Sequence, residues 1–512
     1  MRSPTTATPR RYRRSSGGSS SSVRSPARGA AATQISDTEK ETPDHRRSRA
    51  SPSGSSSSGG GTAPSGALPS WVILNRVGAR RDNFDGDRTT SSVSHTSTGE
   101  RISVSFELVE PPGTSLLVLD WPQGPHPMKS TLSYPPVLAA DGDAVLFEVS
   151  PAATNHPSAP DDYFVYRASG DPSGRPSLSR LPVCYYNHKR RWSTEEPLQR
   201  RLSRVGTGLL CPSKDFFIVA ILERSDYSLS AANLHLQRSV HHKWEVIENV
   251  SIRGVDDGCD LRWWYTDAVL TYLHQSLIWV DYYRGMITAN MSTFVLQYVP
   301  LPVDPVQGNP EDCDYGRGCP EASRSLCVAH GIIKFVAVNT RERSSGFSIT
   351  VWSLSRAYTW IEDATLDAKQ LWDRDCENRL PHVLPEFPVV DRENPDVVCL
   401  LLNESRHNSA SKATTWMIKV HMKEKRPLQI TAYSPDASDK KDFMIAREMS
   451  LGSSFITSGM PLWYSFRQAM KRAHKSEEAK GGSTINKGVC PTQEHEKHLK
   501  TKATSGGLMP VP

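Results

Sequence analysis

The stretch LIWVDYYRGMITANM (Leu277–Met291) decides how the chain is interpreted. Four apolar residues are followed by Asp-Tyr-Tyr-Arg-Gly and then by a second, half-apolar run. Asp281 at the start of a turn can accept hydrogen bonds from backbone amides two residues on, and Gly285 can supply the positive φ of a tight reversal. A catalytic cluster of Asp281, the two tyrosines and Arg284 would need a second convergent group, which nothing local supplies. The stretch therefore predicts a β-hairpin rather than an active site.

Similar strand-like runs recur from Trp71 to about Tyr433. They are rich in Val, Ile, Phe, Tyr, Trp and Thr, are separated by turn residues, and have the composition of strands. Five groups each contain a nearly all-apolar run, an alternating run and a shorter run. The apolar runs are marked by Phe147, Ile218, Ile278, Phe335 and Val398. An earlier group, at residues 71–75, 102–108 and 115–121, supplies a sixth sheet or closes a ring.

Repetition of one small sheet predicts an all-β fold of repeated antiparallel sheets, propeller-like in arrangement, because each sheet buries its apolar surface against the next. The alternative with the same strand count is a β-sandwich pair. Tryptophans inside or beside the predicted strands are expected to pack in the core or between blades: Trp244, Trp279, Trp352, Trp360 and Trp416. Leu366–Trp372 predicts one or two turns of helix.

The two ends differ in composition from this body. Residues 1–70 hold eleven Lys/Arg against four Asp/Glu, and residues 434–512 hold twelve against eight, so the middle carries a net charge of −5. Residues 1–68, with few large apolar side chains, predict a disordered Ser/Arg-rich segment. The body is expected over residues 69–433. Residues 434–512 predict a polar, mostly disordered tail with a basic amphipathic helix near 461–475, expected to be a short terminal helix; its alternatives are a calmodulin target or an anionic membrane surface.

The targeting signals in the sequence are compatible with several cellular compartments. The first 36 residues have seven arginines, nine serines and no acid, which is typical of a plastid or mitochondrial transit peptide, whereas PRRYRR (Pro9–Arg14) is also typical of a nuclear-import patch. The longest apolar run is too short to span a bilayer. Nine cysteines without paired spacing predict reduced thiols in a soluble, intracellular protein.

Two groups of cysteine and histidine residues are candidate zinc sites. The first is Cys313, Cys319 and Cys327 with His330 nearby, and the second is Cys490, His495 and His498. Neither has the Cys-x-x-Cys spacing that presents two thiolates to one ion. We therefore expect ordinary thiols and assign no metal site, no cofactor and no catalytic residue.

Other chemistry is not indicated by local motifs. The sequence has no Gly-x-Ser-x-Gly elbow, no phosphate-binding loop and no His-Glu-x-x-His. The acidic pairs Asp161-Asp162 and Asp256-Asp257 lie beside predicted turns, where carboxylates accept hydrogen bonds from backbone amides.

Several ordered segments resemble a known family: WVDYYRG with LQYVPLPVDP, RWWYTDAVL, TVWSLSRAYTWIEDATLDAKQLW and FPVVDRENPDVVCLLL. PSWVILNRVGARRDNF near the start does so too. The family is the plant-specific one built on domain of unknown function 1618 (DUF1618), and the resemblance covers roughly residues 69–433. It implies a predominantly β fold similar to kelch-like domains associated with F-box proteins. It implies no activity, cofactor or catalytic residue.

Three functions stay open at this stage. The leading hypothesis is a non-enzymatic protein-interaction module that binds an unknown protein or peptide through the loops of one propeller face. The second is a hydrolase or glycan-active propeller whose site forms only in three dimensions. The third is weak nucleic-acid association through the basic ends, because the mildly acidic body lacks the positive surface that phosphates require.

Overall fold

Strands dominate the part of the chain that the structure describes. This computed structural model describes residues 70–83, 89–124, 134–151, 160–168, 175–186, 198–225, 228, 230–255, 261–303, 319–340, 346–374, 380–403, 415–433 and 455–459. All of them belong to one compact unit, residues 64–512. The predicted helix at 461–475, residues 1–68 and most of 434–512 lie outside the described residues, so those predictions stay predictions.

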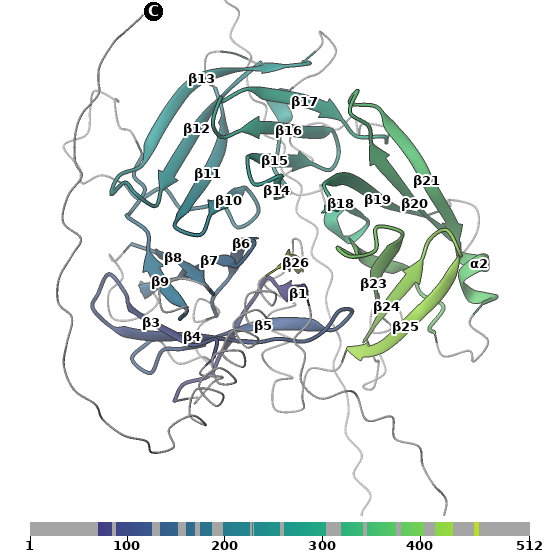
Figure 1. Cartoon of the computed structure of the whole chain (residues 1–512), viewed down its shortest axis with the longest axis horizontal. Helices are drawn as coiled ribbons and strands as arrows, with labels where there is room; N and C mark the ends of the chain where they lie inside the picture. The colour runs from purple at the N-terminus through teal and green to yellow at the C-terminus, as the bar shows by residue number, and fades with distance from the viewer. Residues whose placement is uncertain are drawn as a thin grey trace, which may run out of the picture. The chain divides into compact units, whose positions relative to one another are not determined.

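Six blades, numbered 1 to 6, make up this unit (Figure 1), and blades 3 and 4 share one eight-stranded sheet because their last strands pair in parallel. Blades 2 to 6 are meanders in chain order, and each has four antiparallel strands. Their bounds are β6 (Val137–Asp141), β7 (Ala144–Val149), β8 (Asp162–Arg167) and β9 (Ser177–Arg180) in blade 2; β10 (Thr207–Ser213), β11 (Phe216–Arg224), β12 (Ala231–Arg238) and β13 (Glu245–Arg253) in blade 3; β14 (Ala268–Tyr272), β15 (Ser276–Asp281), β16 (Gly285–Asn290) and β17 (Leu296–Pro300) in blade 4; β18 (Arg324–Ala329), β19 (Ile332–Thr340), β20 (Phe347–Leu354) and β21 (Trp360–Asp367) in blade 5; and β22 (Pro385–Val390), β23 (Val397–Asn403), β24 (Thr415–His421) and β25 (Arg426–Tyr433) in blade 6.

Blade 1 joins the two ends of the body. Its strand order is β26 (Phe455–Ser458), β1 (Val72–Asn75), β5 (Thr114–Asp120), β4 (Arg101–Glu107) and β3 (Ser92–His95), with β2 (Ala79–Arg80) also paired to β5. β26 pairs antiparallel with β1 over four residues. The body therefore uses a segment beyond residue 433, where the sequence placed its end. Two short 3-10 helices, η3 (Leu261–Trp263) and η4 (Pro320–Ala322), and the predicted helix, α2 (Ala368–Trp372), complete the described elements.

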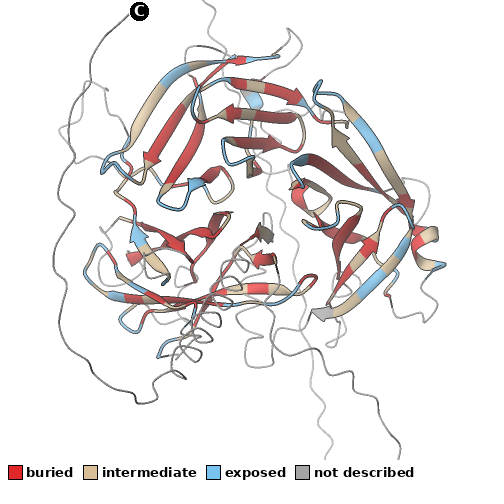
Figure 2. Ribbon diagram, viewed as in Figure 1, coloured by how far each residue is buried: buried red, intermediate tan, exposed pale blue. Residues whose placement is uncertain are grey.

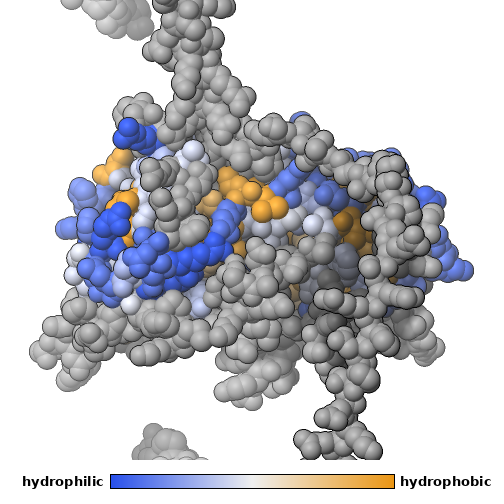
Figure 3. Space-filling view, turned by 90° about the horizontal axis from the view of Figure 1, so that it is seen from below, coloured by the Kyte–Doolittle hydropathy of each residue, from blue (hydrophilic) through white to orange (hydrophobic). Residues whose placement is uncertain are grey.

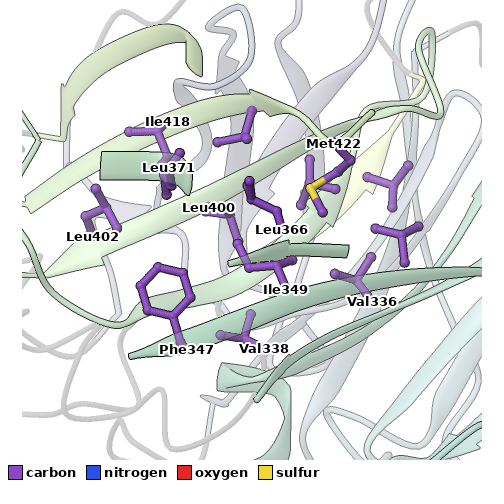
Figure 4. Packing of buried hydrophobic residues seen from close by; sticks show 14 of the residues in the cluster. Val336, Val338, Phe347, Ile349, Leu366, Leu371, Leu400, Leu402, Ile418 and Met422 are labelled. Carbon is purple, nitrogen blue, oxygen red and sulfur yellow. The ribbon is translucent and has the colours of Figure 1, made fainter. Parts of the chain in front are cut away.

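The arrangement of the blades follows from six separate hydrophobic clusters. Each cluster takes its buried side chains from two successive blades, and the sixth joins blade 6 back to β1 of blade 1. Figure 4 shows the cluster between blades 5 and 6, where Val336 and Ile349 face Leu400 and Ile418. A series of interfaces that returns to its first member is a ring. The propeller-like prediction is confirmed.

The second strand of each blade is apolar on both faces because it is packed on both faces. In β23, Val398, Leu400 and Leu402 face blade 5, whereas Cys399 and Leu401 face blade 1. Successive side chains of a strand point to opposite sides, so a strand between two neighbours needs no polar face. Figure 2 shows this burial concentrated on the inner strands, with the exposed positions toward the outer strands and turns. The five tryptophans lie in or against these clusters, as predicted.

The predicted groups of three strands missed one strand per blade. The five marker residues lie in β7, β11, β15, β19 and β23, and each of these follows a first strand that the sequence did not reveal. First strands of neighbouring blades lie next to one another, and β26 lies next to β6. These strands have one edge at the axis, and they carry Ala, Thr and Ser as well as apolar residues, which gives a weaker strand signal.

The stretch that opened the sequence analysis forms the predicted hairpin. β15 and β16 pair antiparallel, and Asp281 stands opposite Gly285. The buried Asp281 carboxylate accepts the amide of Tyr283 at 3.0 Å and pairs with Arg284 at 3.0 Å. Gly285 does not take the positive φ that we expected. It is required for space, because a Cβ there would lie 2.6 Å from both the Tyr298 ring and the Val299 carbonyl oxygen.

Replacing Gly285 with alanine tests this explanation. We expect Gly285→Ala to lower the free energy of unfolding by about 1–3 kcal/mol, since the backbone carbonyl cannot move aside without disturbing β17. Denaturant unfolding measures the change. Gly459→Ala is the matched control, because its Cβ would meet only ordinary contact at 3.7 Å. Equal stabilities of the two variants would contradict the steric argument.

Truncation tests whether β26 closes the ring. A chain ending at residue 433 lacks β26, whereas one ending at residue 462 keeps it. We expect the shorter chain to unfold at lower temperature and to be cleaved faster by protease, since β1 loses its antiparallel partner. Indistinguishable melting and cleavage of the two truncations would show that β26 adds no stability.

Candidate functional site

A cavity of about 390 Å³ lies where the first strands meet. Its walls come from β6, β14, β18, β22 and β26, together with Arg76 just after β1. We call it the axial cavity. Its size is in the range of pockets that bind small molecules.

The two ends of the axial cavity differ. First strands of neighbouring blades run in the same direction, so their turns into the second strands gather at one end, called the mouth. Leu273 and His274 in the β14–β15 turn, and His330 and Gly331 in the β18–β19 turn, line the cavity there and are exposed. Arg76 lies toward the other end, at the level where β6 begins, because its Nη1 donates to the carbonyl of Leu138 at 3.0 Å.

Arg76 is held by backbone groups. Besides Leu138, its Nη1 donates to the carbonyl of Arg204 at 2.8 Å, and its buried Nε has no hydrogen-bond partner. Burial lowers the pKa of Arg76 to about 10, and electrostatic interactions with Glu321 and Tyr282 oppose this shift. The guanidinium is therefore still protonated at neutral pH and keeps a donor free.

Arg392 follows β22 and lines the same cavity. Among the described residues its guanidinium has neither a hydrogen bond nor an ion pair. Burial lowers its pKa, and the nearby Asp141 and Cys327 oppose that shift. An incompletely solvated guanidinium without a partner has an unfavourable free energy that an anion would relieve.

Asp141 ends β6 and is almost fully buried. Its Oδ2 accepts the amide of Cys211 at 2.7 Å, and its Oδ1 accepts the hydroxyl of Thr271 at 2.9 Å. Burial raises the pKa of this carboxyl, and those hydrogen bonds and the charges of His274 and Arg392 oppose the rise. Since Asp141 is directed toward its own partners, it leaves Arg392 unpaired, and the cavity has two guanidinium groups for one carboxylate.

The turns at the mouth have an unfavourable backbone conformation. Leu273, His274 and His330 have φ values of +51°, +53° and +49°, and Gly331 has +73°. Consecutive positive φ values are typical of type I′ hairpins, in which Asn-Gly is preferred. A left-handed conformation costs a residue with a Cβ about 1–2 kcal/mol. A Cβ added at Gly331 would lie 3.4 Å from Leu273, so the two turns lie against each other. Such strain is concentrated at functional sites.

Only some of the candidate metal ligands predicted from the sequence lie at this site. Cys327 and His330 both line the axial cavity, and burial raises the pKa of the Cys327 thiol. Cys319 lies elsewhere, with its thiol donating to Glu321 at 3.5 Å. In the described ranges no three His, Cys, Asp or Glu side chains are grouped to hold a metal ion. The candidates that lie outside the described residues are Cys313, Asp256, Asp257, Cys490, His495 and His498.

The opening hairpin contributes one residue to the cavity after all. Tyr282 lines the wall, and its hydroxyl accepts the amide of Leu326 at 3.1 Å. Burial raises the pKa of its phenol. Arg76, Asp141 and Arg392 went unnoticed in the sequence. All three lie in or next to strands that face the cavity. Predicting the first strands of the blades would have been needed to find them, and the sequence did not reveal those strands.

A second group of charges surrounds Glu148 near the end of β7. The acid is buried, with Arg204 at 3.9 Å, and burial raises its pKa to about 7, with a further rise from Asp161. Asp161 pairs with Arg201 at 2.9 Å. Asp162 accepts the amide of Ser97 at 2.5 Å, so it does bind a backbone amide as predicted, although one from blade 1.

The raised pKa of Glu148 predicts a pH dependence of stability. The ordinary glutamate pKa is 4.5, so the folded chain holds this proton more tightly than the unfolded chain. Stability from this group is complete below pH 4.5 and is lost as the pH rises through about 7. We expect Glu148→Gln to gain up to roughly 3 kcal/mol relative to the native chain between pH 5 and pH 8. Denaturant unfolding at both pH values measures this, with the exposed-site variant Glu110→Gln as control. A gain that does not change with pH would contradict the assignment.

Comparison with known proteins confirms the family resemblance. The sequence model described as "Protein of unknown function (DUF1618)" matches residues 279–399, which lie within the range of the resemblance. No curated protein sequence matches the chain.

Solved structures that are similar to the chain include three of low sequence identity. They are apo AztD from Citrobacter koseri (10% identity, TM-score 0.30, covering 71% of this chain and 82% of that one), the WD40 domain of SCAP from fission yeast (8%, 0.27, 72% and 89%) and an α-L-arabinanase from Penicillium chrysogenum complexed with arabinobiose (9%, 0.25, 68% and 83%). Identities and scores this low indicate nothing about function. Within the described residues, no helix is both long and apolar enough to cross a membrane.

Proposed function

We propose that this chain is a non-enzymatic protein-interaction module that binds a segment of another protein across the mouth of the axial cavity. The observation that carries the proposal is the exposure of Leu273 in the β14–β15 turn and of Ile332, the first residue of β19, which directly follows the strained turn at His330 and Gly331. These side chains are 58% and 42% exposed. Apolar side chains in or beside adjacent turns around a depression are the kind of surface that binds a partner.

The chemistry of the mouth indicates the kind of segment that would bind. Leu273 and Ile332 favour apolar side chains, whereas His274 and His330 beside them favour hydrogen-bond acceptors. The view from below in Figure 3 shows both hydrophilic and hydrophobic areas on the described surface of that side. A short apolar segment with acidic or carbonyl acceptors therefore fits the mouth best.

The lining supports binding better than hydrolysis. Glycoside hydrolysis uses two carboxyl groups on either side of the bond that is cleaved. Of the described residues that line the axial cavity, Asp141 alone is a carboxylate, and both of its oxygens accept hydrogen bonds. Glu148 and Asp161 influence each other, but each also lies beside an arginine, which supports a structural role. These observations favour a binding function, and a hydrolase is the alternative hypothesis.

Affinity capture with three full-length baits tests the proposal. The baits are the native chain, the double variant Leu273→Ser/Ile332→Ser, and a control double variant, Val93→Ser/Leu198→Ser, at apolar positions on blade 1 and between blades 2 and 3. Val93 and Leu198 are 46% and 61% exposed, which matches the mouth pair. We expect a partner that the native chain and the control retain and that the mouth variant loses by about tenfold or more, as measured by quantitative mass spectrometry.

Two results would contradict this function. Identical partners with all three baits would show that the mouth is not the binding surface. Failure of any bait to retain a protein reproducibly would remove the interaction module itself. Circular dichroism of the three baits shows whether each is folded, so a loss by misfolding is recognised.

A further inference from the structure

We propose that the axial cavity is a binding site for a small organic anion that carries a carboxylate or phosphate group, with Arg392 as its principal ligand. Arg392 lies in the β22–β23 turn, at the same end of the cavity as the proposed protein contact, but the anion site uses other residues than that contact does. It would bind its ligand whether or not Leu273 and Ile332 contact a partner.

Charge in the cavity is the first argument. Arg76 and Arg392 both line it, and the described lining offers one carboxylate, Asp141. Asp141 accepts hydrogen bonds from Cys211 and Thr271 and, among the described residues, forms neither a hydrogen bond nor an ion pair with Arg76 or Arg392, although its charge acts on Arg392. Glu321, outside the lining, acts on Arg76, whereas Arg392 has Asp141 nearby but no ion pair with it, so Arg392 is the guanidinium that an added anion would neutralise most directly. Coulomb attraction is stronger in a partly buried depression than in bulk water.

Free donors are the second argument. No described residue accepts a hydrogen bond from the Arg392 guanidinium, and the buried Nε of Arg76 has no partner. A guanidinium presents a planar fork of donors that matches the oxygens of a carboxylate or phosphate. Buried donors in proteins are nearly always paired, so the buried Nε of Arg76 lacks an acceptor. The half-buried Arg392 faces the cavity, where an anion can accept its hydrogen bonds.

The size and walls of the cavity limit the ligand. About 390 Å³ accommodates a molecule larger than a single oxyanion, and the walls between the arginines include apolar residues such as Leu326 and Val389. An anionic group at Arg392 with a short organic body directed toward Arg76 fits this lining.

Arg392 is the residue to change, because Arg76 also supports the fold. Removing Arg76 would leave the carbonyls of Leu138 and Arg204 without their donor. Arg392 supports no described hydrogen bond, so Arg392→Gln removes the charge without breaking a contact. Without added anion we expect this variant to melt at the same temperature as the native chain or higher, since an unpaired, partly buried charge is removed.

Thermal shift and calorimetric titration of the full chain with sodium phosphate and with sodium succinate test the site. Sodium chloride of equal ionic strength is the reference. We expect at least one of the two probes to raise the melting temperature of the native chain saturably. Arg392→Gln should bind that probe about ten- to a hundredfold more weakly, as expected for loss of a charge-assisted hydrogen bond. The control Arg356→Gln, an exposed arginine of the β20–β21 turn, should bind as the native chain does.

A second variant acts in the opposite direction. Asp141→Asn removes the negative charge near Arg392 and should tighten binding of the same probe at neutral pH. A purely structural role of the cavity would not give opposite changes in Arg392→Gln and Asp141→Asn. Phosphate binding without succinate binding, or the reverse, identifies the class of anion and supports the site.

Three outcomes would overturn the proposal. They are the absence of saturable stabilisation by both probes beyond that of chloride, equal affinity of Arg392→Gln and the native chain, and weaker binding by Asp141→Asn. If capture by the mouth fails while anion binding holds, the proposed function is wrong and the anion site stands.

Discussion

Packing of each blade against the next is the constraint on which this structure depends. A small antiparallel sheet of four strands cannot bury both of its faces alone. Here every blade has two apolar faces and therefore needs two neighbours, which a linear array would not give to its end members. Pairing of β26 with β1, and packing of Trp71 and Ile73 against blade 6, give the end members their second interface.

The ring explains where polar groups gather. Second strands are enclosed between two blades and are mostly apolar; all of β7 is buried, and Glu148 is its one ionisable side chain. First strands have one edge toward the axis, where they tolerate Asp141, Thr271 and Ser325. Arg76 and Arg392 extend into the same space from the ends of strands. The axial cavity is therefore a consequence of closure, and its charge comes from residues that only closure brings together.

The mouth and the cavity differ in what they support. Leu273 and Ile332, exposed in or beside strained turns, are suited to a partner that lies across the surface. Free guanidinium donors inside the cavity are suited to a small anion. Neither arrangement resembles a hydrolytic carboxylate pair, and each is the basis of one of the two proposed binding roles.

Sequence alone determined the class of fold, because strand composition and the period of two are local properties. It predicted the apolar second strands, the hairpin of Leu277–Met291 and the short helix at Leu366–Trp372. The local sequence also predicted that the Asp281 carboxylate accepts a hydrogen bond from a backbone amide in its own turn. By contrast, the first strands were hidden because their apolar signal is diluted at the axis, and β26 was hidden in a polar segment.

Tertiary structure decided everything that depends on contacts between distant residues. Gly285 is required by the approach of Tyr298 and Val299 rather than by its own turn, which no local pattern reveals. Arg76, Asp141 and Arg392 belong to three different blades, so their common cavity exists only after the ring has closed. Sequence spacing reports the geometry of a strand or turn, whereas the site is set by how the blades pack around the axis.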